Sequence, residues 1–337
     1  MCVRINRPTV PTIYPPIAEG WHFAVHTVSP PDSRHKPIQV GGAVLAFGTT
    51  LALLAVLRRR GDPRRAPARA ALWAWCPAVP FEAVNNAHID TLGVLLVLVL
   101  ALGTATAGVR RGALLGAAVA VKLLPVLMLP GALSGQRSPK RIARLLSAVL
   151  AAVALVYLPG YLHEAGYEPG HVRRFALLRL LLPDAAAGVA VVVLLALTAL
   201  YVWVRGAPDR PWRGALLLTG TALLLSPNYP WYSLFVVALV ALDGRWEWLT
   251  VNLAGTLLHL GGAALPGILL QTLTYGAAVL AVVLGAFLRS DRTRRMVRRR
   301  LGRLPIPGGW SAAVRMMAMC RATGRKTLPG SRCGQRR

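Results

Sequence analysis

Charged residues are scarce in this chain, and acidic residues are the scarcest of them. Only 15% of the 337 residues are charged, with 12 Asp and Glu against 39 Lys and Arg, whereas 55% are hydrophobic. Soluble domains carry about 25% charged residues, so the composition excludes a soluble enzyme and disfavours a disordered basic protein. A net charge of +27 is also found in nucleic-acid-binding proteins. Here, however, the positive residues form short clusters between long apolar runs, which is typical of a multi-span membrane protein.

Cysteine is equally scarce, and the chain lacks the pattern of a cleavable signal peptide. The four cysteines lie far apart and form neither a metal-ligand spacing nor a disulfide framework: Cys2, Cys76, Cys320 and Cys333. Residues 1–37 contain Pro, Arg and His throughout and no apolar stretch, which excludes a signal peptide there.

Apolar runs divide the chain into predicted membrane helices. A helix needs roughly 20 apolar residues to cross the bilayer. The runs predict an all-α, polytopic transmembrane helix bundle of about nine spans plus one re-entrant segment. The ten runs are 38–57, 69–84, 90–109, 112–133, 142–162, 185–204, 213–226, 229–242, 246–262 and 266–288.

Basic clusters predict the direction of these spans, because cytoplasmic loops are rich in Lys and Arg. The arginines between Arg58 and Arg69 are placed in the cytoplasm, as is the tail from Arg289, which holds fifteen Lys and Arg and one acid. Basic residues on both sides of 112–133 then require this run to enter and leave on the same face, with a turn near Lys122 and Pro125. Outer segments follow at 1–37, 82–90, 163–184 and 226–231.

Three regions result from this topology. Residues 1–37 form an outer-face segment, expected to be the remainder of an N-terminally truncated loop, since an outside N-terminus of this kind predicts upstream spans. Residues 38–288 form the transmembrane domain, and residues 289–337 form a basic, largely disordered cytoplasmic tail.

The outer segment 82–90 is the densest polar stretch. It holds Glu82, Asn85, Asn86, His88 and Asp90 at a membrane boundary. Carboxylates and amides suit sugar hydroxyls, and a carboxylate suits the role of general base. The alternative is a polar turn that caps two helices, with Asp90 as the N-cap of the next span.

Two aromatic and proline-rich segments add candidate substrate contacts. Tyr14 and Glu19 flank a rigid Pro-Pro pair, which suits a loop over an outer cavity or an ordinary helix entry. Trp231 and Tyr232 suit a stacking platform for a sugar, a wall against a lipid chain, or the aromatic belt of the membrane.

Three basic residues are candidates for binding phosphate. Lys122 interrupts an apolar run, which costs about 2.5–3.5 kcal/mol at a helix centre, so it is either functional or paired with an acid. Arg173 and Arg174 lie in the outer loop against the charge bias. They are interpreted as contacts to a lipid phosphate or as partners of acids in that loop.

With these residues identified, the chain resembles the bacterial polyprenyl-phosphate-mannose-dependent mannosyltransferases of the GT-C glycosyltransferase fold. Four short blocks match in order over residues 9–235. They are Thr12-Ile-Tyr14-Pro15-Pro16, then Trp75-Cys76-Pro77 through Glu82 to Asn85-Asn86-Ala87-His88-Ile89-Asp90, then Gly112-Ala-Leu-Leu-Gly116 with Lys122-Leu-Leu-Pro125, then Pro230-Trp231-Tyr232. Ala87 stands where the family usually has Gly. The family also keeps a catalytic aspartate in its first outer loop, which is expected upstream of Met1.

The resemblance implies a hexosyltransferase of the plasma membrane with a cytoplasmic C-terminal tail. It would move a hexose, expected to be mannose, from a polyprenyl-phosphate donor to a lipid-linked or cell-envelope glycan at the outer face. Asp90 and Glu82 are the candidate catalytic carboxylates. No cofactor is implied, and a divalent metal is possible but not demanded. The remaining assignments are Asn85, Asn86, His88, Tyr14, Glu19, Trp231 and Tyr232 as substrate contacts, and Arg173, Arg174 and Lys122 as donor-phosphate contacts.

Two alternatives remain. A transporter or flippase for lipid-linked sugars predicts inverted repeats and paired broken helices. An inactive GT-C-like paralogue is the other, favoured if no upstream segment exists.

Overall fold

The structure is a computed structural model that describes residues 14–60, 63–102, 108–161, 175–226, 229–261 and 267–290. The chain divides into a unit Met1–Gly285 and a second unit Ala286–Arg337. Almost all the described residues belong to the first unit, which contains the features discussed below. The predicted tail 291–337 and the arginines Arg173 and Arg174 lie outside the described residues.

Every regular element in the described part of the chain is helical, which confirms the predicted all-α class. Some elements are short 3₁₀ segments (η2, η3 and η4), and η1 is a π-helix. In chain order the elements are α1 (Pro16–Thr27), α2 (Lys36–Arg60), α3 (Ala66–Ala74), η1 (Val79–Asn85), α4 (Asp90–Leu102), α5 (Gly108–Val121), η2 (Leu124–Met128), α6 (Leu129–Leu133), α7 (Pro139–Tyr161), α8 (Ala176–Arg179), α9 (Asp184–Arg205), α10 (Pro211–Leu225), η3 (Pro230–Tyr232), α11 (Ser233–Asp243), η4 (Trp246–Trp248), α12 (Leu249–Leu260) and α13 (Gly267–Arg289).

Three helices in the described part are long and apolar enough to cross a membrane, namely Lys36–Arg60, Ala185–Arg205 and Gly267–Arg289. The pair Val79–Asn85 and Asp90–Ala101 is bent by 107° and makes a fourth if it is one span. The nine predicted spans and their orientation therefore stay predictions. Several predicted runs are divided instead. Within the run 69–84, for example, α3 ends at Ala74 and η1 begins at Val79, with Pro77 between them and Pro80 in the first turn of η1.

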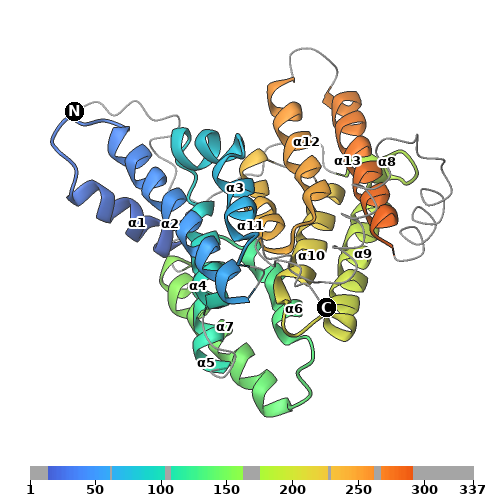
Figure 1. The fold of residues 1–337 in the computed structure, drawn as a ribbon, viewed down its shortest axis with the longest axis horizontal. Coiled ribbons are helices and arrows are strands. Elements are labelled where there is room, and N and C mark those ends of the chain that lie inside the picture. The colour runs from blue at the N-terminus through green and yellow to red at the C-terminus, as the bar shows by residue number, and fades with distance from the viewer. Residues whose placement is uncertain are drawn as a thin grey trace, which may run out of the picture. The chain divides into compact units, whose positions relative to one another are not determined.

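Helices α5 and α7 pack against each other through two glycines, and Figure 1 shows them side by side. A Cβ added at Gly112 would lie 2.6 Å from the Cβ of Ala148, and one at Gly116 would lie 2.6 Å from the Cβ of Ala152. The Gly112–Gly116 pair thus allows a close helix approach. Because α5 ends at Val121, this packing also fixes the position of the next residue, Lys122.

Helix α11 lies at the centre of the core. All its residues from Ser233 to Leu242 are buried, and α2, α3, α4, α10 and α12 pack around it. At the C-terminal end of α11, the guanidinium of Arg69 donates a 3.1 Å hydrogen bond to the carbonyl of Leu242. Gly244 then takes a left-handed conformation with φ of 82° and ends the helix. The N-terminal end of α11, at Ser233, follows directly after the aromatic segment η3.

Candidate functional site

The polar segment 82–90 forms the break between η1 and α4. The backbone N–H of His88 donates to the carbonyl of Glu82 at 2.8 Å, and that of Asn86 donates to Phe81 at 2.9 Å. Ala87 lies between these residues with φ of 50°. This left-handed conformation favours glycine, so the alanine here has an unfavourable backbone conformation.

Helix α2 supports the same segment from one side. The side-chain amide of Gln39 donates a 2.9 Å hydrogen bond to the carbonyl of Asn85. A Cβ at Gly42 would lie 2.2 Å from the carbonyl oxygen of Ala83, so α2 and η1 are in direct backbone contact. Sequence analysis missed Gln39, although a polar residue at the start of an apolar run was a visible signal.

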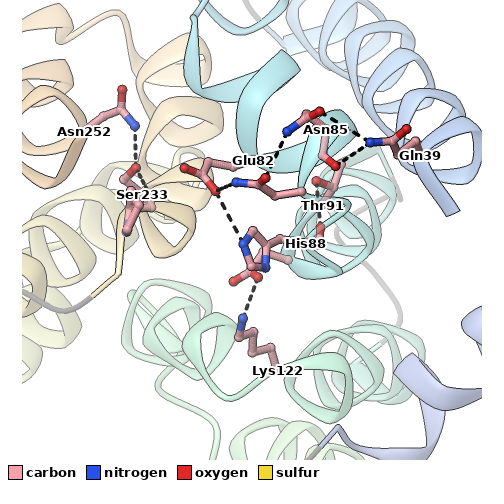
Figure 2. A network of polar contacts seen from close by, with 11 residues as sticks. Gln39, Glu82, Asn85, His88, Thr91, Lys122, Ser233 and Asn252 are labelled. Carbon is pink, nitrogen blue, oxygen red and sulfur yellow. Dashed lines mark hydrogen bonds and ion pairs between the residues drawn. The ribbon is translucent and has the colours of Figure 1, made fainter. Parts of the chain in front are cut away.

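The side chains of the segment form one connected group around Glu82 (Figure 2). Glu82 Oε2 accepts a 3.0 Å hydrogen bond from Asn86 Nδ2 and lies 3.4 Å from His88 Nε2. Asn85 Nδ2 in turn donates to Asn86 Oδ1 at 3.1 Å. Four of the predicted residues therefore lie together, and Glu82 is buried within the group.

Asp90 and Lys122 form an ion pair that joins two separate breaks in the helices. Lys122 Nζ donates to Asp90 Oδ2 at 2.5 Å, and the two side chains are 18% and 5% exposed, respectively. Asp90 begins α4, whereas Lys122 lies between the end of α5 and η2. The predicted break near Lys122 and Pro125 is present. Of the two alternatives for Lys122, the partnership with an acid is observed.

The aromatic segment η3 lies against this ion pair. Lys122 Nζ is 4.7 Å from the ring centre of Tyr232 and 5.8 Å from that of Trp231, both within the range of a cation–π interaction. One side of the ammonium thus faces a carboxylate, and aromatic rings lie close to it as well.

Trp231 stacks with two other rings. Its ring centre lies 4.0 Å from that of His88 and 4.4 Å from that of Tyr229, with interplanar angles of 25° and 5°. Two near-parallel rings at these distances cannot share one face of an indole, so they cover its opposite faces. The role of Trp231 as a sugar platform stays a prediction, and in this structure the rings of His88 and Tyr229 lie against its indole.

Burial, followed by the positive charges of Lys122 and His259, lowers the pKa of His88 to about 4. His88 lies in the turn between η1 and α4, and its ring is neutral at pH 7. Its contact with Glu82 is then between a neutral ring and a carboxyl group.

Tyr14 and Glu19 lie at the border of the site. Tyr14 packs with a small apolar cluster that includes Ile89 and Val121, the neighbours of Asp90 and Lys122 in sequence. Burial, followed by the charges of Asp90 and Glu19, raises the pKa of Tyr14. Glu19 is half-buried on α1.

A second polar network, formed by Cys76, Asn252 and Ser233, anchors η3 through the carbonyl of Pro230. The Cys76 thiol donates to Asn252 Oδ1 at 3.7 Å, Asn252 Nδ2 donates to Ser233 Oγ at 2.5 Å, and Ser233 Oγ donates to the carbonyl of Pro230 at 2.5 Å. Both Asn252 and Ser233 are buried. Sequence analysis did not identify this network, and the only signal was a single Asn within the apolar sequence of α12.

Among the described residues, no group of three or more His, Cys, Asp or Glu is arranged to hold a metal ion. The roles of Arg173 and Arg174 stay predictions, because both residues lie outside the described part of the chain.

Comparison with known proteins gives one result. A family model described as "Glycosyltransferase family 87" matches residues 13–227, well over half of the chain. The matched region includes Glu82, Asp90 and Lys122, whereas η3 lies just beyond it. No curated protein and no solved structure matches the chain.

Proposed function

This chain belongs to glycosyltransferase family 87, and we propose on that basis that it transfers a hexose, specifically mannose, from a polyprenyl-phosphate donor. The acceptor is a lipid-linked or cell-envelope glycan at the outer face of the plasma membrane. The observation that carries this proposal is the Asp90–Lys122 pair, which lies within the region that matches the family and packs against the aromatic segment η3 just beyond it.

The two charges suit the two halves of such a transfer. A carboxylate, Asp90 or Glu82, takes the proton of the acceptor hydroxyl. The hydroxyl oxygen forms a bond to C1 of the sugar while the bond from C1 to the phosphate oxygen breaks. That phosphate oxygen keeps the electron pair, and the ammonium of Lys122 stabilises the charge of the departing polyprenyl phosphate.

The neighbouring groups suit a sugar. Asn86 and the neutral ring of His88 offer hydrogen bonds next to Glu82. The apolar helices around the site suit a donor whose hydrocarbon chain lies in the bilayer. No nucleotide and no metal are required for this chemistry.

The experiment is a transfer assay with the purified protein in lipid nanodiscs. Polyprenyl-phosphate mannose, polyprenyl-phosphate glucose and GDP-mannose, each radiolabelled in the sugar, are offered with an extracted pool of lipid-linked glycans. Label should move from the polyprenyl-phosphate mannose donor alone, and chelation of divalent metals should leave the rate unchanged.

Two variants and a matched control complete the test. Asp90→Asn and Glu82→Gln should each lower the rate at least about a hundredfold if the residue is the proton acceptor. Asp209→Asn removes an exposed carboxylate from a loop and should leave the rate unchanged. Transfer from GDP-mannose alone, or full activity in both carboxylate variants, would overturn the proposal.

A further inference from the structure

The ammonium of Lys122 already has an anionic partner. It lies 2.5 Å from the carboxylate of Asp90, and Tyr232 and Trp231 lie close to it as well. An ammonium has three N–H donors, but here one side of it faces Asp90, aromatic rings lie close by, and the side chain is only 18% exposed, so little of it is open to a second anion. Any phosphate that binds Lys122 therefore has to compete with Asp90.

Accessibility decides which member of the pair a ligand meets first. The side chain of Asp90 is only 5% exposed, whereas that of Lys122 is 18% exposed. An incoming anion is also repelled by the carboxylate and attracted by the ammonium. A phosphate thus reaches Lys122, and Asp90 is left without its cation.

Charge balance gives the consequence for catalysis. Asp90 and Lys122 together carry no net charge, so a bound phosphodiester adds one negative charge to a site that also contains Glu82. Asp90 without its cation is a stronger proton acceptor, and the proton of an acceptor hydroxyl restores the balance. Before the donor binds, Lys122 holds the carboxylate in its ion pair.

We propose that the donor phosphate displaces Asp90 from Lys122, so that the donor binds before the acceptor and frees Asp90 to receive a proton. This inference rests on the proposed function, since it assigns the phosphate to a prenyl-linked sugar donor. It adds to that function a binding order and a step that activates Asp90.

The test measures binding without any sugar transfer. Farnesyl phosphate is titrated into the protein in nanodiscs, with farnesol and inorganic phosphate as the comparison ligands. The proteins are the unaltered chain, Asp90→Asn, Lys122→Gln, the double variant and Asp209→Asn as the matched carboxylate control.

If the phosphate and Asp90 compete for Lys122, the effect of Asp90→Asn on farnesyl phosphate binding should depend on whether Lys122 is present. Asp90→Asn should bind farnesyl phosphate about tenfold more tightly, and Lys122→Gln about tenfold more weakly. In the Lys122→Gln background, Asp90→Asn should add less than about twofold, because the gain requires the ammonium. Asp209→Asn should match the unaltered chain.

Other outcomes would refute either the displacement of Asp90 or the lipid-phosphate donor itself. An equal gain from Asp90→Asn with and without Lys122 means that Asp90 only repels anions, and no gain at all means that it does not compete. Either result refutes the displacement and leaves the proposed function standing. If no protein prefers farnesyl phosphate over farnesol, or if inorganic phosphate binds as tightly, the lipid-phosphate donor itself is refuted.

Folding is controlled separately, because Lys122→Gln leaves a buried carboxylate without its partner. If that variant does not fold, the double variant, which contains neither charge, decides the question. Competition predicts weaker binding than in the unaltered chain, whereas repulsion by Asp90 alone predicts that the gain offsets the loss, so that binding matches the unaltered chain.

Discussion

The hydrogen-bond network of Cys76, Asn252 and Ser233 gives the most direct test of how the site is held in place. Asn252 touches none of the proposed reacting groups, yet it bridges Cys76, just before η1, and Ser233, just after η3. The substitution Asn252→Leu keeps the branched shape of the side chain and removes both hydrogen bonds. If the network positions η3, turnover should fall while the fold remains.

The magnitude follows from the bonds that are lost. The hydroxyl of Ser233 still donates to Pro230 but loses its buried donor, and the thiol of Cys76 loses a weak acceptor. A net hydrogen bond contributes about 0.5–1.5 kcal/mol, and a poorly satisfied buried group costs about 1–3 kcal/mol. We therefore expect a loss of about 1–2 kcal/mol in stability and, because small misplacements lower turnover strongly, a fall in kcat of about tenfold or more.

The assay is steady-state transfer from the polyprenyl-phosphate donor, with a thermal unfolding curve for each variant. The KM for donor should change by less than about threefold, since Asn252 does not contact the proposed phosphate site. Asn252→Leu and Ser233→Ala should not be additive, because both break the same relay. Leu253→Ala, at a residue 54% exposed on the same helix, is the control. Unchanged kcat in Asn252→Leu, or losses that add fully with Ser233→Ala, would refute the reasoning.

Two further predictions concern packing and pH. Gly116→Ala should destabilise the protein by about 1–3 kcal/mol, because its Cβ meets Ala152 at 2.6 Å and the α5–α7 contact has no flexible side chain to yield. Gly276→Ala on α13 should be neutral or slightly stabilising, because its Cβ would meet only the side chain of Leu177, at 3.9 Å. Equal melting temperatures for the two variants would contradict this account. The lowered pKa of His88, about 4 against 6.5, means that the unfolded chain binds this proton more readily. The unfolding midpoint should therefore fall as the pH drops from 6.5 towards 4, and His88→Gln should flatten that slope; an unchanged slope would rule out His88 as its source.

The sequence predicted the local features well, because local chemistry controls them. The polar stretch 82–90 interrupts an apolar run and had to form a break between helices, and Lys122 with Pro125 had to end one. The spacing of the small residues Gly112 and Gly116 is likewise a local feature, and it allows the close packing of α5 with α7.

Long-range pairing could not be predicted in the same way. Asp90 and Lys122 are separated by 32 positions, and nothing in either local pattern specifies the other as its partner. The same applies to Trp231, because no local pattern specifies that its indole stacks with the ring of His88. Hydrophobicity alone also could not decide how apolar runs divide, since α3 and η1 are two short helices within the run 69–84, with Pro77 between them.

Four residues of the candidate site share one structural property, which is that each lies at or beside a break between helices. His88 and Asp90 follow η1, Lys122 follows α5, and Tyr232 lies in η3 just before α11. Broken helices expose backbone polar groups that hydrocarbon cannot satisfy, so in a membrane protein they are tolerated only inside the protein or along a water-filled cavity. Three breaks whose side chains contact one another therefore define a polar interior within an apolar bundle. A sugar-phosphate head group requires such an interior, whereas its lipid chain requires the apolar helices around it.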